Sequence, residues 1–237
     1  MKRIVYFDIL NVIACFCVVC MHCNGWIHKF IKDDLWGARV LVEVVCYFAV
    51  PVFFMLSGAT LLNYRQRYST TEFYKKRFIR TVIPYLFWGY AIFMFLGYLL
   101  ANNNYESNNK LFSVLSVVCI LLLIGRYYLV YQLDEKCEPL FSYFGLYSIL
   151  PSIWVFLFIK RIAKPLQLDR CSYTWRFLAS KSYGVYLLHT FFIVVLEQFI
   201  PMNSLLFMTI GVIIIYLLAI FVTFFLQQNK YTVYFIP

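Results

Sequence analysis

The chain has 237 residues, of which 63% are hydrophobic and 14% are charged, with a mean hydropathy of +0.75 and a net charge of +10. Soluble domains contain about 45–50% apolar and about 25% charged residues, so this composition excludes an ordinary water-soluble domain. The positive charge does not indicate nucleic-acid binding, because the 21 Lys and Arg residues gather at the ends of apolar segments. Such placement is typical of contact with anionic lipid headgroups and predicts a protein of the lipid bilayer.

The apolar residues fall into segments of about 15 to 26 residues, long enough to cross a hydrocarbon layer of about 30 Å as helices. The first segment contains Asp8 and Asn11, so we expect a retained helix rather than a cleaved signal peptide. The loops are short, which predicts a single membrane-embedded domain over residues 1–237. The predicted fold is all-α, a polytopic transmembrane helix bundle of about seven apolar helices. In chain order these helices are residues 4–23, 38–62, 81–101, 111–131, 141–159, 182–200 and 204–226.

The basic residues predict the orientation of these helices. Basic residues precede the first segment, and residues 64–80 and 160–181 contain six Lys or Arg each, so all three places are expected on the cytoplasmic side with the N terminus. Three apolar segments separate the two loops, which would put them on opposite sides. Either a segment between 81 and 159 does not cross, or the rule fails here, or helices are missing. The weakest segment is 111–131, because it contains Arg126, which we expect to extend toward the membrane interface.

Ionisable side chains inside apolar segments are costly and indicate functional sites. On an ideal helix Asp8, Asn11 and His22 lie within about 40–60° of one another and form one polar face. Asp8 and His22 are about 21 Å apart along the helix axis, so they cannot hydrogen-bond directly. This face either lines an interior passage or holds the bundle together by hydrogen bonds between helices. The other residues of this kind are Glu43, His189 and Glu197.

Four stretches of the chain carry motifs in a fixed order: residues 3–22, residues 50–58 (Val-Pro-Val-Phe-Phe-Met-Leu-Ser-Gly), residues 73–84 with Arg-x-x-Arg before a proline, and residues 182–189 (Ser-Tyr-Gly-Val-Tyr-Leu-Leu-His). Together they resemble the acyltransferase 3 family of integral membrane O-acyltransferases. The resemblance implies transfer of an acetyl group, from acetyl-CoA or another acyl-CoA, to a hydroxyl of a cell-envelope glycan or related acceptor, in the inner membrane. Family members are usually longer, so it also implies a shortened or internally deleted member, with central helices missing near residues 102–110.

The resemblance assigns His22 to the position of the family's catalytic histidine, with Asp8 and Asn11 as further catalytic candidates on the same helix. Histidine suits this role, because its unperturbed pKa of about 6.5 lets it take a proton from a hydroxyl near neutral pH. The family commonly has an arginine at the position of Asn11. An amide can still orient a carbonyl group by hydrogen bonding, but it cannot supply that charge.

Further candidates come from the other three motifs. Arg77 and Arg80 match the family's paired arginines and would bind the phosphates of acetyl-CoA, because guanidinium groups suit phosphate oxygens. His189 matches the family's late histidine, and Ser57 belongs to the Ser-Gly end of the second motif. No metal is expected, since Cys20 and Cys23 form a Cys-x-x-Cys on a membrane helix, where small apolar packing residues are the simpler interpretation.

Two other classes of function compete with the enzyme. The first is a catalytically impaired membrane bundle that acts as a partner or export subunit and keeps the motifs. The second is a channel or transporter, which would spread charged residues over several facing helices, whereas here they gather on the first helix and the basic loops. The expected partners of the enzyme are the lipid bilayer, an acyl-CoA and a glycan or other hydroxyl acceptor, with no nucleic acid.

Overall fold

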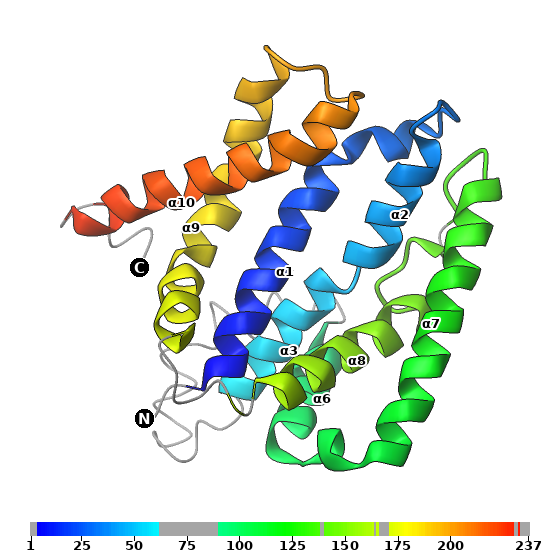
Figure 1. The fold of residues 1–237 in the computed structure, drawn as a ribbon, viewed down its shortest axis with the longest axis vertical. Helices are drawn as coiled ribbons and strands as arrows, with labels where there is room; N and C mark the ends of the chain where they lie inside the picture. Colours follow the sequence, from blue (N-terminus) through cyan, green and yellow to red (C-terminus); the bar gives the residue numbers. More distant parts are fainter. Residues whose placement is uncertain are drawn as a thin grey trace.

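The computed structural model describes residues 4–61, 90–137, 140–163, 165, 171–229 and 232. Helices joined by short connections make up this part of the chain, and no strand occurs in it (Figure 1). The predicted all-α fold is therefore confirmed.

Eight α-helices and three shorter helical segments are described. The α-helices are α1 (Val5–Cys23), α2 (Trp36–Cys46), α3 (Ala49–Leu61), α6 (Ala91–Asn102), α7 (Asn109–Gln132), α8 (Leu146–Ile162), α9 (Cys171–Glu197) and α10 (Val212–Gln228). The shorter segments are the 3-10 helices η1 (Gly25–Lys29) and η4 (Tyr105–Ser107) and the π-helix η7 (Phe207–Gly211).

Five helical stretches of the described chain are long and apolar enough to cross a membrane. Helix α7 exposes large apolar side chains along its length, among them Val117, Leu121 and Ile124. Water would oppose so large an apolar surface, whereas lipid accepts it. The chain is therefore a multi-pass membrane protein. The five stretches are Val5–Cys23, Trp36–Thr60, Asn109–Gln132, Ser172–Glu197 and Phe207–Gln228.

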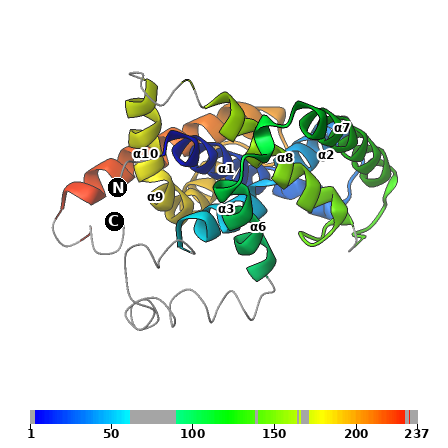
Figure 2. The same ribbon diagram turned by 90° about the horizontal axis from the view of Figure 1, so that it is seen from below.

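Helix α1 lies at the centre of the bundle. Its buried residue Leu10 belongs to a core shared with α3, α6 and α8, whereas Val19 belongs to a second core shared with α9 and α10. Figure 2 shows the same arrangement from below, with α9 and α10 to one side of α1 and with α2, α7 and α8 to the other. A polar side chain on α1 can therefore face the space between two groups of helices.

Several helices begin or end near the first turn of α1, which we call the Asp8 end of the bundle. The buried Lys160 of α8 donates hydrogen bonds to the carbonyls of Leu100 (2.8 Å) and Asn103 (2.6 Å), at the end of α6. Lys160 also forms an ion pair with the buried Glu106 (3.2 Å). Helix α8 packs against the first turn of α1. Thr60 of α3 and the first turn of α1 line the same cavity. The ends of α3, α6 and α8 therefore lie together.

The opposite end, which we call the His28 end, holds η1 and the last turn of α7. The indole nitrogen of Trp36 donates to the carbonyl of Tyr131 (2.9 Å), and Lys32 pairs with Asp134 (2.7 Å). Helix α7 starts at the Asp8 end, where Asn109 accepts a hydrogen bond from α8. It therefore runs the full height of the bundle.

The positions of these helix ends bear on the conflict between the two basic loops. Residues 81–101 were predicted to cross, but their described part is α6, a 12-residue helix of about 18 Å that ends where α3 ends. Residues 81–89 lie outside the described chain. Since α7 runs to the His28 end and α8 returns, α3 and α8 both end at the Asp8 end. This arrangement favours the first of the three explanations, a segment that does not cross.

The predicted segment 38–62 is confirmed as a stretch long enough to cross a membrane, Trp36–Thr60. It is divided into α2 and α3, because the ring of Pro51 would clash with the carbonyl of Tyr47 in an unbroken helix. One predicted helix start was wrong. The helix predicted to start at residue 182 starts at Cys171, since no Gly or Pro interrupts residues 171–181. Charged residues in 171–181 made this stretch resemble a loop. One of them, Lys181, donates a hydrogen bond to Gln227 of α10.

Candidate functional site

Three hollows follow one another along the polar face of α1. The Asp8 cavity, of about 360 Å³, is lined by Asp8, Asn11, Ser57 and Thr60 among others. The central cavity, of about 560 Å³, is lined by Asn11, Ser57 and His22 together with residues of α9. The Glu43 cavity, of about 210 Å³, is lined by His22 and by residues nearer the His28 end.

The sequence-predicted polar residues stand where these cavities meet. Asn11 and Ser57 line both the Asp8 cavity and the central cavity. His22 lines both the central cavity and the Glu43 cavity, and it is the only ionisable residue common to those two linings. The polar face therefore lines a series of hollows, and His22 near its end is exposed.

A second histidine lies beside His22. The rings of His22 and His189 are 4.9 Å apart between centroids, with their planes at 56°. His189 is buried, and its Nδ1 lies 3.1 Å from the carbonyl oxygen of Val185. Because a carbonyl only accepts, Nδ1 carries the proton of the neutral ring, and Nε2 of that tautomer is an acceptor with no hydrogen-bond partner within the described chain. The long α9 thus places a buried imidazole acceptor next to the end of α1.

The central cavity has mixed walls that suit a partly apolar ligand. Phe53 and Phe54 of α3 provide apolar surface, and Tyr186 of α9 packs edge-on against Phe53 with ring centroids 6.5 Å apart. Ser180 and Ser182 of α9 add hydroxyl groups. Pockets that enclose a small ligand usually hold about 300–1,000 Å³, and this cavity falls within that range.

The Glu43 cavity brings together residues from four parts of the chain. Glu43 of α2 is 3% exposed, and its Oε2 has no hydrogen-bond partner within the described residues. The rings of Tyr47 and Tyr143 are stacked at 4.4 Å and also line the cavity. His28 and Lys136 stand at its edge toward the His28 end. The Glu43 cavity is therefore lined mainly by polar and aromatic side chains.

The sequence predicts that Arg126 of α7 extends toward the membrane interface, but in the structure it does not. The side chain is fully buried, and its guanidinium carbon lies 3.9 Å from the centroid of the Tyr47 ring. Glu43 supplies an opposite charge nearby. The aromatic face and the Glu43 carboxyl compensate only part of the cost of burial, because none of the three guanidinium nitrogens has a hydrogen-bond partner within the described residues. The side chain is nevertheless buried inside the bundle, so the prediction that it extends to the interface was wrong.

His28 is exposed at the rim of the Glu43 cavity. Partial desolvation of its ring, and to a lesser extent the positive charge of Lys136, lower the pKa of His28 below its usual value of 6.5. At neutral pH the ring therefore carries one donor and one acceptor nitrogen. Such a ring suits hydrogen bonding with hydroxyl groups better than binding of an anion.

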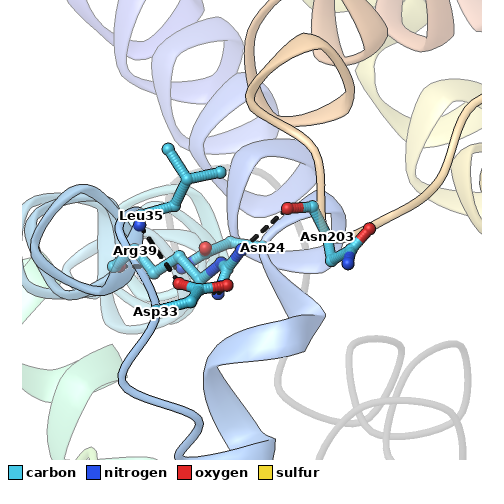
Figure 3. A network of polar contacts seen from close by, with 5 residues as sticks. All are labelled: Asn24, Asp33, Leu35, Arg39 and Asn203. Atoms are coloured by element: carbon cyan, nitrogen blue, oxygen red, sulfur yellow. Dashed lines mark hydrogen bonds and ion pairs between the residues drawn. The ribbon is translucent and has the colours of Figure 1, made fainter.

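A network of polar contacts fixes the end of α1 beside His22 (Figure 3). Arg39 of α2 donates to both carboxylate oxygens of Asp33 (2.8 and 2.9 Å) and to the carbonyl of Asn203 (2.8 Å), between α9 and α10. Asn24, directly after α1, donates to the carbonyl of Arg39 (2.9 Å). The network therefore ties α1, α2 and the α9–α10 connection together at the His28 end.

Replacement of Arg39 by methionine should destabilise the protein by about 3 kcal/mol, because it removes charge-assisted hydrogen bonds from a fully buried guanidinium. Thermal unfolding in detergent measures the loss. Lys32→Met is the matched control, since Lys32 forms an exposed ion pair at the same end, worth less than about 1 kcal/mol. Equal effects of the two variants would contradict a structural role for the Arg39 network.

Not every predicted site residue can be placed. Arg77 and Arg80 lie outside the described residues. Glu43, Tyr47 and Tyr143 were not predicted as site residues, although Glu43 stood out as an ionisable residue in an apolar segment. Within the described ranges, no group of three or more His, Cys, Asp or Glu side chains could hold a metal ion.

The comparisons with known proteins cover the first half of this architecture. A family model described as an acyltransferase domain, that of the acyltransferase 3 family, matches residues 4–114. The matched region contains α1, α2, α3 and α6 and therefore Asp8, Asn11, His22, Glu43 and Ser57. No curated protein and no solved structure matches the chain.

Proposed function

We propose that this chain, which belongs to the acyltransferase 3 family through residues 4–114, transfers an acetyl group from acetyl-CoA or another acyl-CoA to a hydroxyl of a cell-envelope glycan or related acceptor. The observation that supports this proposal most is the position of His22. Its imidazole lines two cavities that lie on either side of it along α1. A thioester in one cavity and an alcohol in the other would both be within reach of one base.

The reaction needs one proton acceptor and no redox partner. The His22 imidazole takes the proton of the acceptor hydroxyl as its oxygen bonds to the thioester carbonyl carbon. The tetrahedral intermediate then collapses, the carbon–sulfur bond breaks, and the CoA thiolate leaves with the proton from the imidazolium. The products are the acyl ester and CoA, with all atoms and charges balanced.

The residues between the Asp8 cavity and the central cavity would guide the acyl donor. Asn11 and Ser57 line both cavities, and the amide of Asn11 would donate to the thioester carbonyl. The Ser57 hydroxyl donates to the carbonyl of Phe53 (3.0 Å), so it presents an acceptor oxygen to the cavities. Asp8 lines the approach from the Asp8 end. Arg77 and Arg80 are proposed to bind the phosphates of CoA, on the resemblance of their motif alone.

His189 is proposed as a positioning residue for His22. Its unprotonated Nε2 is buried beside the His22 ring and can accept a hydrogen bond from it or from a bound hydroxyl. Either contact would fix the orientation of the His22 ring, as partners of catalytic histidines do in other acyl-transfer sites.

The proposed orientation follows from the donor. Acetyl-CoA is a cytoplasmic metabolite, so the Asp8 end would face the cytoplasm and the N terminus with it. The helices that flank both basic loops, α3 and α8, end there, in agreement with the positive-inside rule. The protein would then lie in the inner membrane, with the His28 end outward.

Transfer of radiolabelled acetyl groups from acetyl-CoA by membranes that contain the chain tests the proposal. We expect labelled product with the unaltered protein and none above background with His22→Ala at equal expression. Binding of acetyl-CoA without transfer would favour the catalytically impaired partner or export subunit instead. Transfer that survives His22→Ala would remove His22 from the mechanism.

A further inference from the structure

The Glu43 cavity is set apart from the donor path. It shares Val18, His22 and Val50 with the central cavity and lies on the side of His22 toward the His28 end. Its volume of about 210 Å³ is below the roughly 300–1,000 Å³ of pockets that enclose a whole small ligand. It therefore fits one unit of a larger molecule that enters from that end, rather than an acyl-CoA.

The polar groups of the cavity suit a ligand rich in hydroxyl groups. The carboxylate oxygen Oε2 of Glu43 is buried without a hydrogen-bond partner in the described chain, a costly arrangement unless a ligand or water donates to it. A hydroxyl group is such a donor. His28, neutral at pH 7, offers a further donor and acceptor at the same cavity.

The aromatic lining adds an apolar surface of matching shape. Tyr47 and Tyr143 lie with their ring planes 17° apart, and Phe141 also lines the cavity. The C–H face of a sugar ring packs on such flat apolar surfaces, while its hydroxyls reach polar groups at the edge. Because Tyr143 stacks on Tyr47 and Arg126 also lies over the Tyr47 ring, the flat surface left for a sugar comes from Tyr143 and Phe141.

We infer that the Glu43 cavity is the acceptor subsite and that it binds one sugar unit, with Glu43 accepting a hydrogen bond from a hydroxyl of that sugar while His22 faces the hydroxyl that is acylated. The inference rests on the proposed function and deepens it, because it separates the acceptor from the donor along α1. Glu43 touches the substrate in this arrangement but does not transfer the proton.

The test measures the two substrates independently. Labelled acetyl transfer is followed in membrane vesicles, with a carbohydrate extract of the cell envelope titrated as acceptor at saturating acetyl-CoA, and then the reverse. Glu43→Gln should raise the half-saturating amount of extract by roughly tenfold, because the buried carboxyl that accepts from the sugar hydroxyl is replaced by an amide that places an NH2 group at one of its two oxygen positions. The half-saturating acetyl-CoA concentration should stay within about twofold. Glu135→Gln, at an exposed residue outside the cavity, is the control and should change neither.

Glu43→Gln also alters the partner of Arg126 and could fail to fold, so a second variant tests the same cavity without changing Glu43. Tyr143→Leu removes an aromatic face of the cavity and leaves Glu43 and Arg126 unaltered, and it should weaken the dependence on extract in the same direction. If either folded variant changes the acetyl-CoA dependence instead, or neither changes the acceptor dependence, the subsite assignment is wrong although His22-dependent transfer remains. Absence of any His22-dependent transfer would overturn the proposed function itself.

Discussion

The acyl-transfer rate of a His22→Gln variant is expected to fall by about 10²–10⁴-fold at saturating acetyl-CoA, the usual contribution of a general base. Glutamine keeps a polar side chain of similar reach but cannot take up a proton, so binding in the two adjoining cavities should change little. The measurement is the rate of labelled acetyl transfer with both substrates saturating. A fall in apparent affinity with an unchanged maximal rate would contradict the role of base.

His189→Gln provides the comparison for this variant. Because His189 is proposed to orient the His22 ring, its loss should lower the rate less than the loss of His22. The double variant should be no slower than His22→Gln alone, since residues that act as a unit do not contribute additively. Additive losses would show that the two histidines act independently, and a shifted pH profile in His189→Gln alone would separate positioning from simple structural support.

Gly97→Ala is expected to destabilise the bundle by about 3 kcal/mol or more. A Cβ atom on Gly97 would overlap the backbone carbonyl of Met55, and one on Gly58 would overlap that of Met94. Helices α3 and α6 approach so closely because each offers a glycine at the crossing, as membrane helices commonly do. Backbone atoms cannot rotate aside as a side chain can, so the two helices would have to separate. Unfolding in detergent at increasing temperature measures the effect.

Gly125→Ala is the matched control for that substitution. Gly125 lies in the middle of α7, and a Cβ there would meet nothing within 4 Å. Alanine is favoured over glycine in a helix by up to about 1 kcal/mol, so this variant should be neutral or slightly more stable. Similar losses in both variants would mean that the α3–α6 crossing is not the cause.

The sequence predicted the helical membrane fold and the polar face of α1 because both depend on local spacing. Apolar segments of bilayer length fold as helices whatever their neighbours, and Asp8, Asn11 and His22 share a face through helix periodicity alone. The break just before Pro51 is also a local feature, since a proline excludes one continuous helix. The early start of α9 was hidden by charged residues such as Lys181, whose partner Gln227 lies on α10.

The partners of the buried ionisable residues were decided by packing between helices that are distant in the chain. Arg126 was expected at the interface, yet Tyr47 and Glu43, more than 70 residues away, hold it inside. The same holds for the pairing of His22 with His189 and for the meeting of two cavities at His22. Hydropathy and periodicity describe how one helix relates to lipid and water. Which side chains meet across helices depends on crossing angles and close contacts such as Gly58 and Gly97, and only the folded bundle fixes these.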